Sequence, residues 1–290
     1  MRWMILLPLL VGCSGSAPDS TALLADETLQ RDTSAGRLAY ELERDEEAVT
    51  QYRAALTRAQ ERDDLGAIGD TGYDLAVAEL RANAPDRALA DARATRAELE
   101  RRGAEPFPAL LLVEATALYR TGAVAEADRA AQPIQRAADA DAAAKATFLR
   151  GLIADERGDE AGLSAAVDML NGAKTQALEA DFAELAARLA LRRGDPALAL
   201  EQAARAAELR QSTLDYRGLA RVLALEGAAA ARAGDESAAD LFLRAGRSAA
   251  AQGDKASARV WLRRARSLAA GQPVGRAAAD LLRGLNQDDR

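Results

Sequence analysis

Seven triplets of small or apolar residues, with spacings of four and three, recur along this 290-residue chain. Residues at these spacings lie on one face of an α-helix. The triplets are Ala48-Tyr52-Ala55, Ala88-Ala92-Thr95, Ala127-Ala131-Ile134, Leu163-Val167-Leu170, Ala199-Ala203-Ala206, Ala239-Leu243-Gly246 and Ala258-Leu262-Ala265. A small residue stands twelve positions before each of them, at Gly36, Ala76, Ala115, Gly151, Ala187, Gly227 and Gly246. A regular recurrence of this kind predicts a stack of similar helical units.

Turn-forming residues separate each small residue from its triplet. They are Gly158-Asp159, Gly194-Asp195-Pro196, Gly234-Asp235 and Gly253-Asp254, with Arg44-Asp45 and Asn83-Ala84-Pro85 in the equivalent places. Glycine accepts the left-handed conformation that ends one helix, aspartate caps the free amides of the next, and proline fits a first turn. Each unit is therefore predicted to be two antiparallel helices joined by a tight turn.

This combination of small residues, turns and triplets resembles the tetratricopeptide (TPR) repeat over about residues 22–270. The resemblance implies an all-α solenoid of about seven antiparallel helix pairs, a TPR-like superhelix. Successive triplets start 40, 39, 36, 36, 40 and 19 residues apart, whereas the family unit has 34 residues. Two residues also depart from or only partly keep the family pattern. The family's aromatic residue in the second helix is clear only at Tyr52. Pro133 lies inside a predicted helix, where it should cost a backbone hydrogen bond and cause a kink.

A further helix is expected at residues 274–286, where Ala277, Leu281, Leu282 and Leu285 share one side. Terminal repeats need such a cap to cover their last apolar face.

The only cysteine, Cys13, follows Leu10-Val11-Gly12 behind an apolar stretch that begins after Arg2. The stretch is too short to span a membrane, and its order is typical of a cleaved secretory signal. An ordinary signal peptide is one interpretation. The N-terminal segment resembles a bacterial lipoprotein precursor, which is the second interpretation. The lack of a second cysteine and the polar Ser14–Ser20 segment favour it. That resemblance implies cleavage before Cys13 and lipidation of its thiol and amine.

We therefore expect a lipoprotein signal peptide at residues 1–12, a flexible tether at 13–21 and a helical-repeat domain at 22–290. In Gram-negative lipoproteins an aspartate after the cysteine favours retention in the inner membrane, and this chain has Ser14 there. In a Gram-negative host, the resemblance thus implies a protein anchored in the outer membrane through Cys13 and facing the periplasm.

Residues for catalysis are scarce. The chain has no histidine, which removes the usual general base, most zinc sites and any serine or cysteine triad. No phosphate-binding or dinucleotide-binding motif is present, and Asp139 with Asp141 is better explained as a helix start than as a cation site. We expect no enzyme, no cofactor and no metal. The net charge of −7, without runs of lysine or arginine, disfavours nucleic acid.

Binding of other proteins is the remaining role, and solenoids usually bind on their concave face. The first helices should turn Tyr, Phe, Arg and Lys side chains towards that face, and such residues dominate interface energies. The candidates are Arg37, Tyr40, Tyr73, Arg81, Tyr119, Arg120, Lys145, Phe148, Arg188 and Arg192. Tyr40 and Phe148 could instead be buried between units. Asn83, Asn171 and Asn286 are not placed as a TPR clamp for acidic C-terminal peptides would need.

The function expected is a lipid-anchored TPR scaffold for protein partners. Similar lipoproteins assist outer-membrane, pilus or cell-wall assembly, and the residues do not select among these processes. The alternative is a ligand-binding TPR subunit associated with a solute transporter. An enclosed apolar pore would favour the ligand-binding subunit, and an open groove of Arg and Tyr would favour the protein-binding scaffold. An enzyme would need two facing carboxylates in a deep cleft.

Overall fold

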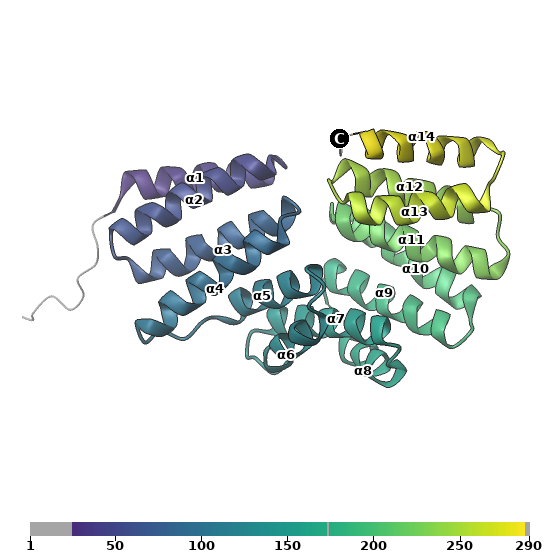
Figure 1. The fold of residues 1–290 in the computed structure, drawn as a ribbon. Coiled ribbons are helices and arrows are strands. Elements are labelled where there is room, and N and C mark those ends of the chain that lie inside the picture. The colour runs from purple at the N-terminus through teal and green to yellow at the C-terminus, as the bar shows by residue number, and fades with distance from the viewer. Residues whose placement is uncertain (1–24, 173, 288–290) are drawn as a thin grey trace, which may run out of the picture.

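The computed structural model describes residues 25–172 and 174–287. Within these ranges it contains fourteen α-helices and no β-strand. In chain order they are α1 (Glu27–Glu41), α2 (Asp45–Glu61), α3 (Leu65–Arg81), α4 (Pro85–Arg101), α5 (Pro108–Arg120), α6 (Val124–Ile134), α7 (Ala140–Arg157), α8 (Glu160–Leu170), α9 (Gln176–Arg192), α10 (Pro196–Ser212), α11 (Tyr216–Ala233), α12 (Ala238–Ala251), α13 (Lys255–Leu268) and α14 (Pro273–Gln287). Each helix packs on the next (Figure 1), which confirms the predicted all-α, TPR-like solenoid. Cys13 and the expected tether lie outside the described residues.

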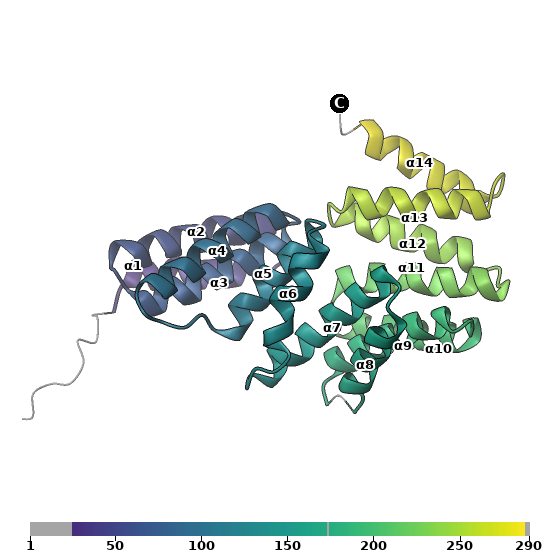
Figure 2. The ribbon, with the colours of Figure 1, turned by 60° about the horizontal axis from the view of Figure 1, so that its bottom comes forward.

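The solenoid curves so that its two halves face each other. Helices α1–α4 form an N-terminal arm, α9–α14 form a C-terminal arm, and α5–α8 connect the two (Figures 1 and 2). The arms meet again where Asn83 Nδ2, in the α3–α4 turn, donates to the carbonyl oxygen of Gly253, in the α12–α13 turn, at 2.9 Å. This contact joins residues 170 positions apart and closes the curve around the concave face.

Small residues allow the helices of a pair to pack closely, as predicted. A methyl group on Gly36 would lie 2.8 Å from Cδ1 of Tyr52, and one on Gly246 would lie 2.6 Å from Cγ of Leu262. Ala48 and Ala55 of the first triplet are fully buried. In the α8 triplet the central residue is wrong, because Val167 is only partly buried and Ala166 packs against Gly151 instead. The sequence repeat therefore corresponds to the contact between the two helices of each unit.

The triplet assigned to α12 is wrong by one residue. Ala238, Phe242 and Ala245 are buried, whereas Ala239 and Leu243 are only partly buried. At the helix start the amide of Ala238 donates to the carbonyl of Asp235, three residues back. Phe242 packs against Gly227, and the aromatic of the second helix is not confined to Tyr52.

The turns have the predicted chemistry. Gly158, Gly194, Gly234 and Gly253 have φ between +73° and +77°. The side chains of Asp159, Asp195 and Asp254 accept hydrogen bonds from backbone amides of the helices that follow. Pro133 does not kink a longer helix, because α6 ends one residue later, at Ile134. Pro133 has no amide hydrogen, so the hydrogen bond that this position would donate to the carbonyl four residues back is lost, as predicted.

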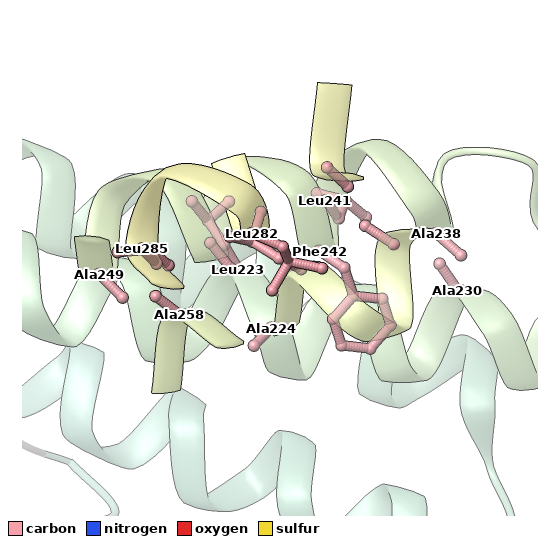
Figure 3. Packing of buried hydrophobic residues seen from close by; sticks show 14 residues of the cluster. Leu223, Ala224, Ala230, Ala238, Leu241, Phe242, Ala249, Ala258, Leu282 and Leu285 are labelled. Atoms are coloured by element: carbon pink, nitrogen blue, oxygen red, sulfur yellow. The ribbon is translucent and has the colours of Figure 1, made fainter. Parts of the chain in front are cut away.

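The C-terminal helix covers the last pair, as expected. Helix α14 extends one residue beyond the predicted 274–286 at each end, and its buried Ala278, Leu282 and Leu285 pack on α12 and α13 (Figure 3). Ala277, expected on this side, is exposed, because the buried stripe runs one residue later.

In the described part of the chain, none of the helices combines the length and apolar character that crossing a bilayer requires.

Candidate functional site

A cavity of about 690 Å³ lies between the two arms. Its wall comes from α1, α3, α5 and α7 on one side and from the α10–α11 turn and α11 on the other. Of the ten residues expected on the concave face, six line it: Tyr40, Arg81, Tyr119, Arg120, Lys145 and Phe148. The volume is within the usual range for sites that bury a small molecule or a short peptide segment.

The other four expected residues lie outside this cavity. Arg37 is exposed on α1. Tyr73 packs edge to face against Phe107, with ring centroids 5.7 Å apart. Arg188 and Arg192 form ion pairs with Asp155 at 2.8 and 2.6 Å.

Tyr40 and Arg81 form a rigid corner of the cavity. The Arg81 guanidinium lies over the Tyr40 ring, 3.4 Å from its centroid, which is cation–π geometry. Arg81 Nε also donates to Asp45 Oδ1 at 2.6 Å, and its Nη2 donates to the backbone carbonyl of Tyr40. These contacts hold the guanidinium in one orientation, with its charge balanced by Asp45.

Two further arginines, Arg120 and Arg217, lie where the arms meet. Both donate to Asn83 Oδ1, Arg120 Nη2 at 2.6 Å and Arg217 Nη1 at 3.3 Å. Burial, together with the nearby Arg217 charge, lowers the pKa of Arg120 to about 10. Burial also lowers the pKa of Arg217. Both groups stay charged at neutral pH, at a cost in solvation.

A buried ion cluster fixes the C-terminal wall of the cavity. The Glu184 carboxylate is fully buried and accepts hydrogen bonds from Arg188, Arg210 and Arg221 at 2.6–3.0 Å. The Arg210 and Arg221 guanidiniums lie 5.4 and 5.5 Å from the centroid of the Phe148 ring. The cluster therefore joins α9, α10 and α11 to a residue of α7 across the base of the two arms.

A second depression, of about 590 Å³, continues the concave face along the C-terminal arm. Arg221 lines both hollows. The cationic side chains along the combined face are Arg81, Arg120, Lys145, Arg188, Arg217, Arg221, Arg263 and Arg264, and the carboxylates that line it are Glu43, Asp45 and Asp215. Arg81, Lys145, Arg188 and Arg221 are neutralised by ion pairs with carboxylates. In the described part of the chain, the positive charge left without an ion pair on this face belongs to Arg120, Arg217, Arg263 and Arg264.

Exposed apolar side chains lie at the cavity wall where the C-terminal arm begins. Leu214 is 65% exposed and has φ of +57°, and Tyr216 is 42% exposed. Glu43, Asp63 and Asn83 have the same left-handed conformation in other turns between helices, so Leu214 occupies a regular turn position. The α10–α11 turn thus presents an apolar edge beside the arginines.

Several cavity residues were missed by the sequence prediction: Leu214, Tyr216, Arg217 and Arg221. All of them belong to the sixth unit, which returns to the cavity only because the solenoid curves. The sequence feature that could have identified them is the Tyr216-Arg217 pair at the start of a first helix. Tyrosine and arginine are the residue types that marked most candidates on the other first helices.

No group of three or more Cys, Asp or Glu side chains in the described ranges is arranged to hold a metal ion. No family model matches the chain, and no curated protein matches it.

Two solved structures are similar in fold. A tetratricopeptide repeat protein from Parabacteroides merdae is 15% identical, with a TM-score of 0.49, over 90% of this chain and 99% of that one. The TPR2AB domain of yeast Sti1, in a structure titled as its complex with pHSP90, is 17% identical, with a TM-score of 0.36, over 89% of this chain and 96% of that one. At these levels the likeness concerns the helical-repeat architecture alone.

Proposed function

We propose that this protein is a lipid-anchored helical-repeat scaffold whose concave face binds an extended acidic segment of a protein partner. The observation that carries the proposal is that two neighbouring hollows, the cavity between the arms and the second depression, share Arg221 in their walls. A hollow divided between two depressions suits an extended chain better than a compact small molecule.

The charge distribution supports an acidic partner. Eight cationic residues line the two hollows, and four of them, Arg120, Arg217, Arg263 and Arg264, form no ion pair with the described residues. Arg263 and Arg264 are exposed on α13. Electrostatic complementarity of this kind accelerates encounter and excludes partners of the wrong charge. The aromatic rings of Tyr40 and Phe148 and the exposed Leu214 supply apolar contacts between the charges.

The proposed location is the outer membrane of a Gram-negative envelope, with the repeats on the periplasmic side. It rests on the Leu-Val-Gly-Cys head, on Ser14 after the cysteine and on the short segment between Cys13 and the first helix. Several acyl chains, at about 0.8 kcal/mol per buried methylene, hold a protein on a bilayer durably. We propose outer-membrane, pilus or cell-wall assembly as the setting.

In-cell photocrosslinking tests the binding face. A benzoylphenylalanine at position 216, on the cavity wall, should capture partner proteins, whereas one at position 198, on α10 and outside both depressions, should not. The two positions are matched in exposure, since Tyr216 is 42% and Leu198 is 44% exposed. Arg264→Glu should reduce capture from position 216, and Arg247→Glu, on the exposed side of α12, should not. Equal capture from both positions would contradict the proposal.

A small ligand is the second candidate, in the setting of a solute transporter. The closing contact between Asn83 and Gly253 favours it, because that contact narrows one side of the cavity. Native mass spectrometry of the protein purified from its own host should then show a stable adduct of less than about a kilodalton, consistent with the volume of such sites. Unliganded protein that still captures partners from position 216 would exclude this function.

A further inference from the structure

The point where the arms meet contains two guanidiniums with neutral partners only. Arg120 is the last residue of α5 and Arg217 the second residue of α11, and both line the cavity. They share the Asn83 amide oxygen. Their other acceptors are backbone carbonyls, that of Leu80 for Arg120 and that of Arg81 for Arg217, the latter at 3.1 Å.

The carboxylates nearest this pair are committed elsewhere. Across residues 25–172 and 174–287, neither guanidinium forms an ion pair. Asp45 is bonded to Arg81, and Asp215 is bonded to Arg210 at 2.6 Å. Asp254 is near enough to favour the charged state of both arginines, but its carboxylate caps α13 by accepting from the Ser257 amide at 3.0 Å.

Two partly buried positive charges around one neutral oxygen are an unfavourable arrangement in the empty protein. Burying an ionised group without a counter-charge is expensive, and like charges at short range repel. A guanidinium satisfied by a neutral amide can exchange that contact for a charge-assisted hydrogen bond, which is shorter and about twice as strong. The arrangement is therefore suited to receive an anion from the cavity.

We propose that Arg120 and Arg217 together bind a carboxylate of the partner's acidic segment, so that one anionic group bridges the connecting helix α5 and the C-terminal arm. This inference rests on the proposed function and names the subsite within it. Arg120 belongs to α5 and Arg217 to the C-terminal arm, so an anion held by both favours the closed arrangement of the solenoid. A ligand that binds one arrangement better than another shifts the population towards it.

Isothermal titration calorimetry of the purified full-length protein tests the subsite, with a tetra-aspartate peptide blocked at both ends as the probe. Arg120→Gln and Arg217→Gln should each weaken peptide binding by about tenfold or more, because charge-assisted hydrogen bonds are lost. Arg247→Gln, which removes an equal charge from α12 outside the cavity, should bind as the wild type does. Titration with inorganic phosphate shows whether the site prefers a partner carboxylate to a free anion. Phosphate binding as tight as peptide binding would overturn the assignment to a partner carboxylate.

Stability without peptide separates an anion site from a structural latch. If the pair exists to receive an anion, Arg217→Gln relieves repulsion, and its melting temperature equals or exceeds that of the wild type. A clear fall in melting temperature, with peptide affinity unchanged, would overturn the proposal and make the arginines a latch.

Asn83→Asp provides a test that keeps both arginines. The substitution places a carboxylate between the two guanidiniums and removes the hydrogen bond to Gly253. Because this carboxylate already neutralises the site, peptide affinity should fall. Unchanged affinity in Asn83→Asp would overturn the subsite.

The outcomes also separate this subsite from the proposed function. Wild-type and glutamine variants that bind the peptide equally would overturn the subsite and leave the concave-face proposal intact. A wild type that binds no acidic peptide would overturn both.

Discussion

Arg221 and Glu184 form a two-pronged ion pair, with Arg221 Nε 2.6 Å from Glu184 Oε1 and Arg221 Nη2 2.8 Å from Glu184 Oε2. The glutamate is fully buried, whereas the arginine side chain is 30% exposed and lines both concave hollows. The buried carboxylate thus orients a guanidinium that faces the binding surface. Burial alone would raise the pKa of Glu184, but Arg221, Arg188 and Arg210 hold it well below its usual range.

Glu184→Gln should destabilise the fold strongly. The substitution keeps the shape of the side chain but removes the carboxylate that pairs with Arg221, whereas Arg210 keeps Asp181 and Asp215. Breaking a buried ion pair costs about 3–5 kcal/mol. Urea unfolding followed by circular dichroism measures the change in the free energy of unfolding. Glu201→Gln, on the exposed side of α10, is the control. A loss below about 1 kcal/mol, the range of exposed pairs, would show that the cluster is not structural.

Gly246→Ala should destabilise the C-terminal arm. Its methyl group would lie 2.6 Å from Cγ of Leu262, which is fully buried. Overpacking of this kind costs about 1–3 kcal/mol. Gly284→Ala in α14 meets no atom within 4 Å and should leave stability equal or higher. Thermal unfolding of the two variants compares them directly, and equal melting temperatures would contradict the close approach of α12 and α13.

The helix pairs were predictable because their determinants are local. Small residues, triplets and Gly-Asp turns all act within one unit, so periodicity could find them. The register of α12 was not predictable from the same pattern, because two triplets with the expected spacing stand side by side in the sequence. The predicted one begins at Ala239, and the buried one begins a residue earlier, at Ala238.

The candidate site was only partly predictable, for a different reason. Tyr40, Arg81 and Lys145 lie on the first helices of the first, second and fourth units, so helix position alone placed them on the cavity. Arg217 reaches the same cavity from the opposite arm, 134 residues away from its partner Asn83. That meeting depends on the accumulated rotation of the whole solenoid, which no local pattern encodes.

Stability should increase as the pH falls from about 7 towards 4, in part because of Asp74. Burial, with the nearby Asp70 carboxylate, raises the pKa of Asp74 to about 6 from an ordinary value near 4. A folded-state pKa above the unfolded one means that the charged form costs stability above about pH 6, and that protonation relieves this cost. Melting temperatures measured at half-unit pH steps test this. Asp74→Asn should be more stable than the wild type at pH 7.5 and should show a smaller rise on acidification. Identical pH profiles would contradict the assignment.

Cys13→Ala should release the protein from the membrane. Under the proposed lipid anchoring, loss of the thiol prevents attachment of the acyl chains that hold the protein on the bilayer. Membrane fractionation in a Gram-negative host, with mass spectrometry of the mature N-terminus, measures both consequences. Ser14→Asp is the companion variant, and it should move the lipidated protein to the inner membrane. A Cys13→Ala protein that stays in the membrane fraction would contradict lipid anchoring.

The charge of the partner segment tests the central claim most directly. Peptides crosslinked to benzoylphenylalanine at position 216 in living cells can be sequenced by mass spectrometry. A concave face on which Arg120, Arg217, Arg263 and Arg264 form no ion pair with the described residues predicts that these peptides come from acidic segments, with Asp or Glu next to the crosslinked residue. Crosslinked segments of neutral or positive net charge, recovered equally from wild type and Arg264→Glu, would contradict it.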